Sequence, residues 1–395
     1  MSSDHSLPAD FFKGNWNYPT RMRFGAGKIK ELAAELKGLG VSRPLLVTDP
    51  GLAKLPMIQE ALAALRAAGL QAQLYSDVKS NPVGRNVLDG VAIYRAGKHD
   101  GVIAWGGGSA LDAAKAIALM SGQPGALWDY EDRGDNWLRV VPKGVAPILA
   151  VPTTAGTGSE VGRVSVITDE SDHTKKLIFH PKMLPSVVIS DPELTVGLPA
   201  HITAATGMDA LAHCLEAYCA PGFHPMADGI AVEGMRLVKE WLPLAVKDGK
   251  DLRARAAMLA AATMGATAFQ KGLGAIHALS HPVGALYDTH HGLTNAVFMP
   301  YVLVFNRSAV EERLTRLASY LGLKHPSFQA VLDWTLALRE EFKMPHRLTG
   351  LGVDDKQLDL LSRMAANDPT AGTNPLPVGV AELRGLFEAA LEGRV

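Results

Sequence analysis

The first half of the chain alternates short apolar runs with longer amphipathic stretches rich in Ala and Leu. The short runs contain many β-branched residues and predict buried strands, whereas the longer stretches have the spacing of helices with one apolar face. Regular alternation of strand and helix is typical of a parallel sheet covered by helices, so an open α/β layer fold is predicted here. The strand and helix pairs are Pro44–Thr48 with Ile58–Ala68, Gln71–Tyr75 with Val87–Arg95, and Gly101–Trp105 with Ala110–Met120.

The pattern changes near residue 200. Three further apolar runs, Ala146–Val151, Val164–Thr168 and Val187–Ser190, are predicted to add strands to the first layer. From Ala200 onward helical spacing dominates and strand signal is scarce, which predicts an all-helical second domain. Its clearest helical stretches are Ala204–Tyr218, Ala227–Trp241, Asp251–Ala268 and Val310–Leu321. The predicted domains are therefore residues 1–195 and 196–395, joined near the proline-rich segment Asp191–Pro199.

The composition argues against several classes of binding partner and of protein. The 395 residues include 39 basic and 40 acidic side chains, so the net charge of −1 favours neither nucleic acid nor an anionic membrane. The two cysteines, Cys214 and Cys219, form neither a disulfide framework nor a CxxC pair. The N-terminal segment up to Arg23 has no apolar core of a secretory signal, and no run is long enough to span a bilayer. The expected location is the cytoplasm.

A glycine-rich turn joins the third strand to its helix. Gly106, Gly107, Gly108 and Ser109 follow the strand directly, so backbone N–H groups and the positive end of the helix dipole could receive a pyrophosphate. Leu111 stands where the dinucleotide fingerprint has its third glycine, and no Lys-Ser/Thr pair completes a P-loop. A strand-to-helix turn without a ligand therefore remains an alternative.

A second polar turn, Pro152–Glu160, follows another predicted strand. Its threonines, serine and glycines offer hydroxyl and backbone donors, which favours a phosphate or ribose contact over a plain connection. Thr157 precludes the GxSxG pattern of a serine hydrolase around Ser159. Asp49, at the end of the first strand, could accept the ribose hydroxyls and repel a 2′-phosphate, which favours NAD over NADP. It could equally be a turn residue before Pro50 and Gly51.

Histidines concentrate in the helical half, where seven of the thirteen lie between His201 and His291. Asp209 and His213 are four residues apart, as are His277 and His281, so each pair shares one helix face. A single histidine in an apolar helix is commonly a hydrogen-bonded core residue. Two such pairs and His291, in Ala/Leu-rich helices, instead indicate a shared divalent cation. Three imidazoles and one carboxylate suit Fe(II) or Zn(II), and the spacing does not choose between them.

Four segments together resemble the iron-containing (group III) alcohol dehydrogenase family. The resemblance runs from Arg21 to the C-terminus, and it rests on the order and spacing of the motifs. These motifs are Gly106–Lys115, Pro152–Glu160, Gly207–His213, and Gly274–Gly284 with His291-Gly292.

The resemblance implies a Rossmann-like NAD(P) domain, a helical-bundle domain that holds the metal, and an active site in the cleft between them. It places the metal ligands on Asp209, His213, His277 and His291, and a non-ligating active-site histidine, our candidate proton relay, on His281. It places nucleotide contacts on Asp49, Asn81, Gly107, Gly108, Ser109, Thr153, Thr154, Thr157 and Lys176. His290 stands where many members have proline, which leaves open whether His290 or His291 reaches the metal. The family also implies a homodimer.

The implied reaction is hydride transfer between NAD and a short primary alcohol or aldehyde bound at Fe(II) or Zn(II). A hydroxy-acid substrate of the 4-hydroxybutyrate type is the alternative, for which Arg163 or Lys271 could hold the carboxylate. Both could equally be surface charges or cofactor contacts. Two further alternatives are a lyase of the dehydroquinate-synthase type, whose site should carry more cationic residues, and a nucleotide-binding sensor, which needs no aligned ligands.

Overall fold

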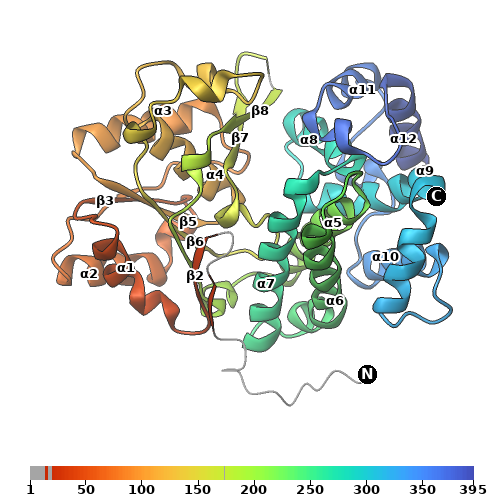
Figure 1. The fold of residues 1–395 in the computed structure, drawn as a ribbon, viewed down its shortest axis with the longest axis horizontal. Helices are drawn as coiled ribbons and strands as arrows, with labels where there is room; N and C mark the ends of the chain where they lie inside the picture. The colour runs from red at the N-terminus through yellow and green to blue at the C-terminus, as the bar shows by residue number, and fades with distance from the viewer. Residues whose placement is uncertain (1–13, 17–19, 173) are drawn as a thin grey trace. The chain divides into compact units, whose positions relative to one another are not determined.

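The computed structural model describes residues 14–16, 20–172 and 174–395 (Figure 1). The rest of the N-terminal segment, for which no secretory signal is predicted, lies outside the described residues. The chain divides into two compact units. One consists of Met1–Thr154, Gly158–Gly197 and Lys250–Leu259, and the other of Ala155–Thr157, Leu198–Gly249 and Ala260–Val395. The main change of unit thus follows Gly197, within the predicted linker.

The first unit is built on a seven-stranded sheet. Its strand order is β1-β2-β9-β6-β5-β3-β4, and every neighbouring pair is parallel except β1 with β2. The strands are β1 (Gly14–Trp16), β2 (Arg21–Phe24), β3 (Pro44–Val47), β4 (Gln73–Tyr75), β5 (Gly101–Gly106), β6 (Ile148–Pro152) and β9 (Val187–Ser190). All residues of β3, β5, β6 and β9 are buried, as expected of parallel strands covered on both faces.

Helices cover both faces of this sheet (Figure 1). The helices α1 (Leu32–Gly38) and α2 (Pro56–Ala67) lie on one face, where Leu36 and Ile58 join a core with Trp105 of β5. On the other face lie α3 (Gly84–Ala96) and α4 (Gly108–Met120). The parallel α/β layer predicted from the alternating pattern is therefore confirmed.

One predicted strand takes a different place. The run Val164–Thr168 was expected in the main sheet, but it forms β7 (Val164–Asp169), which pairs antiparallel with β8 (Thr174–Phe179) in a separate two-stranded sheet. This part of the prediction was wrong. In β7 every second residue is buried, which is the pattern of a strand covered on one face only, whereas β3, β5, β6 and β9 of the main sheet are buried throughout.

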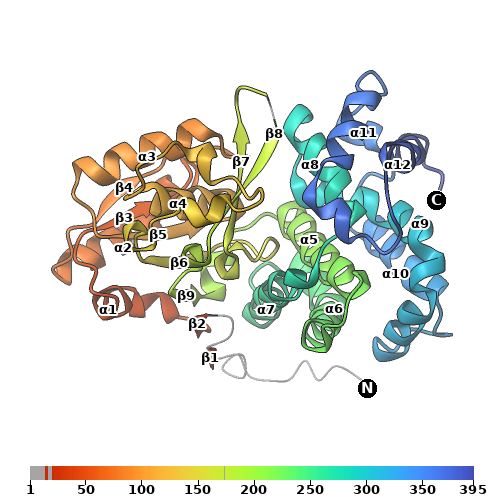
Figure 2. The ribbon, with the colours of Figure 1, turned by 45° about the horizontal axis from the view of Figure 1, so that its top comes forward.

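The second unit is helical, and no described residue from Ala200 onward forms a strand. Its central helix α5 lies beside α6 (Figure 2). Nearly every residue of α5 from Thr203 to Tyr218 is buried, so its polar side chains must find partners inside the unit. The helices are α5 (Ala200–Cys219), α6 (Pro225–Lys247), α7 (Leu252–Ala268), α8 (Ala275–Tyr287), α9 (His291–Tyr320), α10 (Phe328–Glu341), α11 (Leu358–Ala366) and α12 (Val380–Glu392).

Two observations complete the comparison with the predicted helices. The stretch Val310–Leu321 is the C-terminal part of the long helix α9, and α7 contributes residues to both units. Among the described residues, no helix combines the length and apolar character needed to cross a bilayer.

Candidate functional site

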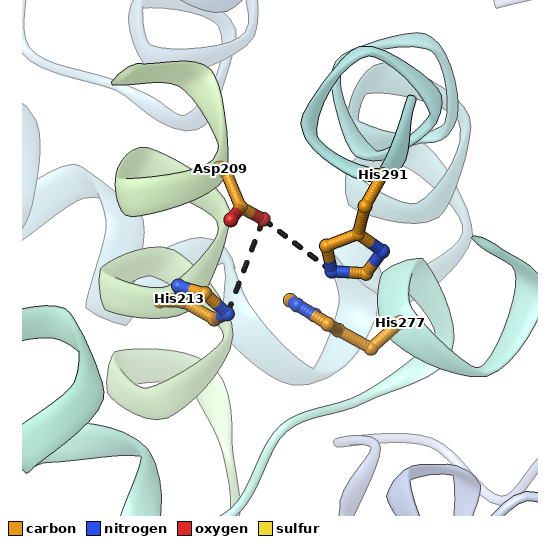
Figure 3. Close-up of side chains that lie close together, drawn as sticks. All are labelled: Asp209, His213, His277 and His291. Atoms are coloured by element: carbon orange, nitrogen blue, oxygen red, sulfur yellow. Dashed lines mark ion pairs between the residues drawn. The ribbon is translucent and has the colours of Figure 1, made fainter. Parts of the chain in front are cut away.

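Helix α5 supplies two of the four predicted ligands. Asp209 and His213 are four residues apart and project from the same face of the helix, and both are buried. The Nε2 atom of His213 lies 4.0 Å from Oδ1 of Asp209 (Figure 3). A buried carboxylate and a buried imidazole one turn apart form half of a chelating set.

The other two predicted ligands come from α8 and α9. His277 is buried in α8, and His291 is the first residue of α9, with Nε2 3.5 Å from Oδ1 of Asp209. One ligand atom from each of the four residues falls within 4.8 Å of the others, and Figure 3 shows the four side chains converging from three helices. Gly292 permits this approach of α9 to α5, because a Cβ there would lie 2.3 Å from the carbonyl oxygen of Ala205.

Two of the rings are anchored through their outer nitrogens. Nδ1 of His213 donates to the backbone oxygen of Gly156 at 3.3 Å, and Nδ1 of His277 donates to Oε2 of Glu216 at 2.5 Å. Both acceptors lack a proton to give, so the hydrogen of each neutral ring lies on Nδ1. Each Nε2 therefore keeps its lone pair, and the two rings stack with centroids 4.7 Å apart.

The pKa values of the two rings shift in opposite directions. Burial lowers the pKa of His213 to about 4, which outweighs the opposing charge of Asp209 and keeps the ring neutral near pH 7. Burial would also lower the pKa of His277, but the charge and hydrogen bond of Glu216 outweigh it, and the pKa is raised. Glu216 thus favours positive charge next to His277, whereas the charge of Asp209 is not enough to do so at His213.

The donor set fits a divalent cation. Asn295, in α9, places its Nδ2 atom 2.8 Å from Oδ1 of Asp209 and 3.2 Å from Nε2 of both His277 and His291. Three lone-pair atoms therefore converge on one point, while Oδ1 of Asn295 is buried without a hydrogen-bond partner among the described residues. Three imidazole nitrogens and a carboxylate oxygen are ligands that iron and zinc accept.

His281 lies beside the four candidate ligands and is not one of them. Its ring stacks on His291 with centroids 5.5 Å apart, and its Nδ1 contacts Oδ2 of Asp368 at 2.7 Å. Burial would raise the pKa of Asp368, but the neighbouring His281 outweighs it, so the pKa is lowered and the carboxylate is charged. An imidazole oriented by a carboxylate next to a metal site can accept and pass on a proton.

The structure also places the residues whose roles the sequence left open. His290 caps the start of α9, where its Nδ1 accepts from the backbone N–H of Leu293, and His291 is the residue that joins the ligand set. Lys271 is only 2% exposed and forms an ion pair with Asp228 at 2.6 Å. Arg163 is exposed and lies over the ring of Phe179. The charge of Lys271 is therefore paired with that of Asp228 within the helical unit.

In the sheet unit, the predicted nucleotide contacts gather at the carboxyl ends of adjacent strands. The backbone N–H of Thr153 donates to the oxygen of Gly106 at 3.0 Å, and a Cβ on Gly107 would lie 3.2 Å from Thr154. Gly108 and Ser109 open α4, whose first N–H groups face this edge. Asp49, after β3, uses Oδ1 to accept the N–H groups of Gly51 and Leu52, 2.8 and 2.9 Å away.

The remaining predicted contacts have other partners or belong to the other unit. Asn81 has a left-handed backbone with φ of 52°, and its Oδ1 accepts from Nζ of Lys175 at 2.9 Å. The predicted Lys176 instead pairs with Asp169 and with Asp172 at 3.2 Å. Thr157 is grouped with the helical unit, and Thr153 and Thr154 with the sheet unit.

A buried lysine fixes the second polar turn to α4. Nζ of Lys115 donates to the backbone oxygens of Ser159, at 3.1 Å, and Val164. Asp112, one turn earlier, accepts Oγ of Ser159 at 2.5 Å and the N–H of Val166 at 2.9 Å. The end of the turn is therefore held by α4, the helix that follows the glycine-rich turn.

Sequence reasoning missed three residues that touch the ligand set or His281. Glu216 follows Asp209 by seven residues on the same face of α5, and Asn295 follows His291 by four residues in α9, so both had a helical-spacing signal. Asp368 is 87 residues from His281 and lies in a turn, so nothing local in the sequence pointed to it.

Comparison with known proteins agrees with this arrangement. A family model described as iron-containing alcohol dehydrogenase matches residues 19–192, and the model of its C-terminal part matches residues 203–391. The chain is 41% identical to a 4-hydroxybutyrate dehydrogenase of Cupriavidus necator, over 95% of this chain and 99% of that protein. It is 36% identical to an NAD-dependent methanol dehydrogenase of Bacillus methanolicus, over 95% and 100%.

Solved structures give the same result. A crystal structure of a 1,3-propanediol oxidoreductase, 35% identical, superposes with a TM-score of 0.87 and covers 94% of this chain and 97% of its own. The matched models together span most of the sequence, including all four candidate ligands. The chain therefore belongs to the iron-containing alcohol dehydrogenase family.

Proposed function

We propose that the protein is a metal-dependent, NAD-linked dehydrogenase that interconverts a short primary alcohol and its aldehyde. The observation that carries this proposal is the convergence of Asp209, His213, His277 and His291 within 4.8 Å in a buried part of the helical unit. Family membership favours the dehydrogenase over the lyase and sensor alternatives. Fe(II) is the proposed metal, with Zn(II) as the alternative.

The two bound groups supply the chemistry that side chains lack. Asp209, His213, His277 and His291 would hold a divalent ion, which would supply Lewis-acid chemistry toward the alcohol oxygen, and bound NAD would supply the hydride acceptor. The hydroxyl proton then needs an acceptor. We assign this role to His281, because Asp368 engages Nδ1 and leaves Nε2 to take the proton.

The sheet unit supports NAD binding through backbone and hydroxyl donors. We propose that Gly107, Gly108 and Ser109 hold the pyrophosphate at the start of α4, with Thr153 and Thr154 as neighbouring donors. Oδ1 of Asp49 accepts two backbone N–H groups, and its Oδ2 can accept the ribose hydroxyls. A carboxylate there disfavours a 2′-phosphate, which is the basis for proposing NAD over NADP.

A hydroxy acid is the second candidate substrate. It is favoured by the 4-hydroxybutyrate dehydrogenase at 41% identity, whereas the pairing of Lys271 with Asp228 removes one of the two cations considered for its carboxylate. The homodimer and the cytoplasmic location stay predictions. Light scattering coupled to size exclusion tests the dimer directly, since the monomer mass is 42.0 kDa.

A substrate panel tests the proposed activity. The protein is loaded anaerobically with Fe(II) or Zn(II), and NADH absorbance is followed with short alcohols, diols, aldehydes, 4-hydroxybutyrate and the corresponding semialdehyde. Turnover ranked highest for unbranched alcohols and aldehydes supports the proposal, and preference for the hydroxy acid moves the function to the second candidate. Absence of NADH-linked turnover with either metal contradicts both.

A further inference from the structure

Helix α5 carries a third acidic or imidazole side chain on the face that holds Asp209 and His213. Glu216 follows Asp209 by seven residues, about two turns, and is 5% exposed. Its Oε2 accepts Nδ1 of His277 at 2.5 Å, and its Oε1 accepts the backbone N–H of Ile276 at 2.7 Å. Both oxygens are therefore engaged by the start of α8, the helix that carries His277.

The contact determines which nitrogen of His277 faces the ligand set. An ionised carboxylate only accepts hydrogen bonds, so Nδ1 carries the hydrogen and Nε2 presents its lone pair. His213 is held less strongly, because its acceptor is the neutral carbonyl of Gly156 at 3.3 Å. Charge-assisted hydrogen bonds are shorter and stronger than neutral ones, so Glu216 orients its ring more firmly than Gly156 does.

The segment that Glu216 contacts, the start of α8, has a second set of hydrogen bonds. Oδ1 of Asn374 accepts the N–H of Ala275 at 3.1 Å and Nδ2 of Asn306 at 2.9 Å, and Nδ2 of Asn374 donates back to Asn306 at 2.8 Å. The first residues of α8 are thus fixed by α5 on one side and by the C-terminal segment on the other. Glu216 therefore contacts a segment of α8 that hydrogen bonds hold from both sides.

The charges balance only if Glu216 is counted. Three carboxylates touch the ligands or their immediate neighbour, namely Asp209, Glu216 and Asp368, and Asp368 is paired with His281. Asp209 and Glu216 then supply two negative charges against a divalent cation. Without Glu216, the buried site would carry a net positive charge, and an uncompensated buried charge is strongly unfavourable.

We propose that Glu216 is a positioning residue of the metal centre: it holds His277 with Nε2 toward the ion and supplies the second negative charge, and so sets the affinity for divalent metal. This inference rests on the metal-dependent function proposed above. It assigns Glu216 no contact with substrate or metal. Its action goes through His277.

Metal affinity provides the test. Apo-protein is titrated with Zn(II) in competition with a fluorescent chelator at fixed pH, with folding checked by circular dichroism. Glu216→Gln keeps the shape of the side chain but removes its charge, and we expect affinity to fall by roughly 10–100-fold. Glu233→Gln is the control, because this carboxylate binds Arg236 and Tyr320 in the same unit and contacts no ligand. Its affinity should equal that of the wild type.

The outcomes separate the two proposals. A wild-type protein that binds no Zn(II) contradicts the metal-dependent function itself. A wild type that binds while Glu216→Gln binds equally well overturns only the role of Glu216, and so does a loss of apo stability without a change in affinity.

Should Glu216→Gln fail to fold, the wild-type apo-protein decides the question. Nitrogen-15 NMR, with His277→Gln to assign the signal, should show the Nδ1–H form of His277. The Nε2–H form would overturn the proposal.

Discussion

His281 is the residue on which the proposed proton transfer depends. We expect His281→Ala to lower kcat by roughly 10²–10⁴-fold, because a general base is lost while the four ligands stay in place. Metal content, measured by elemental analysis, should match the wild type. His290→Ala is the control, because that histidine caps α9 and lies outside the ligand set. Unchanged turnover in His281→Ala would contradict the assignment.

Two buried tyrosines in the sheet unit predict a loss of stability in alkali. Burial, reinforced by nearby Asp77 and Asp89, raises the pKa of Tyr75 to about 12, and burial also raises that of Tyr94 to about 12. The unfolded chain ionises these phenols near pH 10 and the folded chain resists until about pH 12, so stability falls as the pH rises through this window.

The variant Tyr75→Phe checks this linkage. It loses the hydrogen bond from the phenol to the backbone oxygen of Asn86, so stability near pH 7 should fall by about 0.5–1.5 kcal/mol. Between pH 10 and 12, however, stability should decline less steeply than in the wild type. Urea unfolding at several pH values measures both effects, and an unchanged slope in this window would show the linkage to be wrong.

At the scale of elements, the close approach of α9 to α5 brings His291 to Asp209. We expect Gly292→Ala to destabilise the protein by roughly 1–3 kcal/mol and to weaken metal binding, because its Cβ would lie 2.3 Å from the oxygen of Ala205 and 2.9 Å from Cβ of Asp209. Gly385→Ala in α12 is the matched control, since nothing lies within 4 Å of its added Cβ. Equal metal affinity in the two variants would contradict this account of the site.

The attachment of the second polar turn to α4 predicts an effect on NAD binding. Lys115→Met removes the Nζ donor to the oxygens of Ser159 and Val164, of which the first keeps the N–H of Gly162, and it leaves Asp112 without its cation. Because a buried ion pair loses one partner, we expect a destabilisation of roughly 3 kcal/mol. The KM for NAD should rise, because the turn carrying Thr153 and Thr154 loosens. The exposed Lys37 provides a control through Lys37→Met. A stable variant with an unchanged KM would refute the link.

Elements with strong periodicity could be predicted from the sequence, and those decided by distant partners could not. Local patterns of apolar residues in the sequence predict the strands β3, β5 and β6 and the helices α2 and α4. Whether β7 joins the main sheet depends on its partner β8, whose residues have no apolar alternation. Because β8 is half-buried and begins with polar residues, the sequence pattern did not predict the hairpin of β7 and β8.

The same division applies to the candidate site across the whole molecule. Helical spacing brought out Asp209, His213, His277 and His281, because residues four apart share a face. Asp368 reaches His281 across 87 residues through tertiary packing, which no local pattern records. The ambiguity between His290 and His291 also needed the structure, because the start of α9 decides which ring caps the helix and which points inward.

The central claim concerns the whole protein: one divalent ion, held by the helical unit, makes it an NAD-linked alcohol dehydrogenase. The most direct measurement is an anaerobic titration of chelator-treated protein with Fe(II), following the rate of NADH formation from a short alcohol. The account predicts no turnover without metal. The rate of NADH formation should then rise linearly with added Fe(II) and level off at one ion per chain. In Asp209→Asn the rate should not level off at one ion per chain. Turnover in the metal-free protein, or a rate indifferent to added ion, would contradict it.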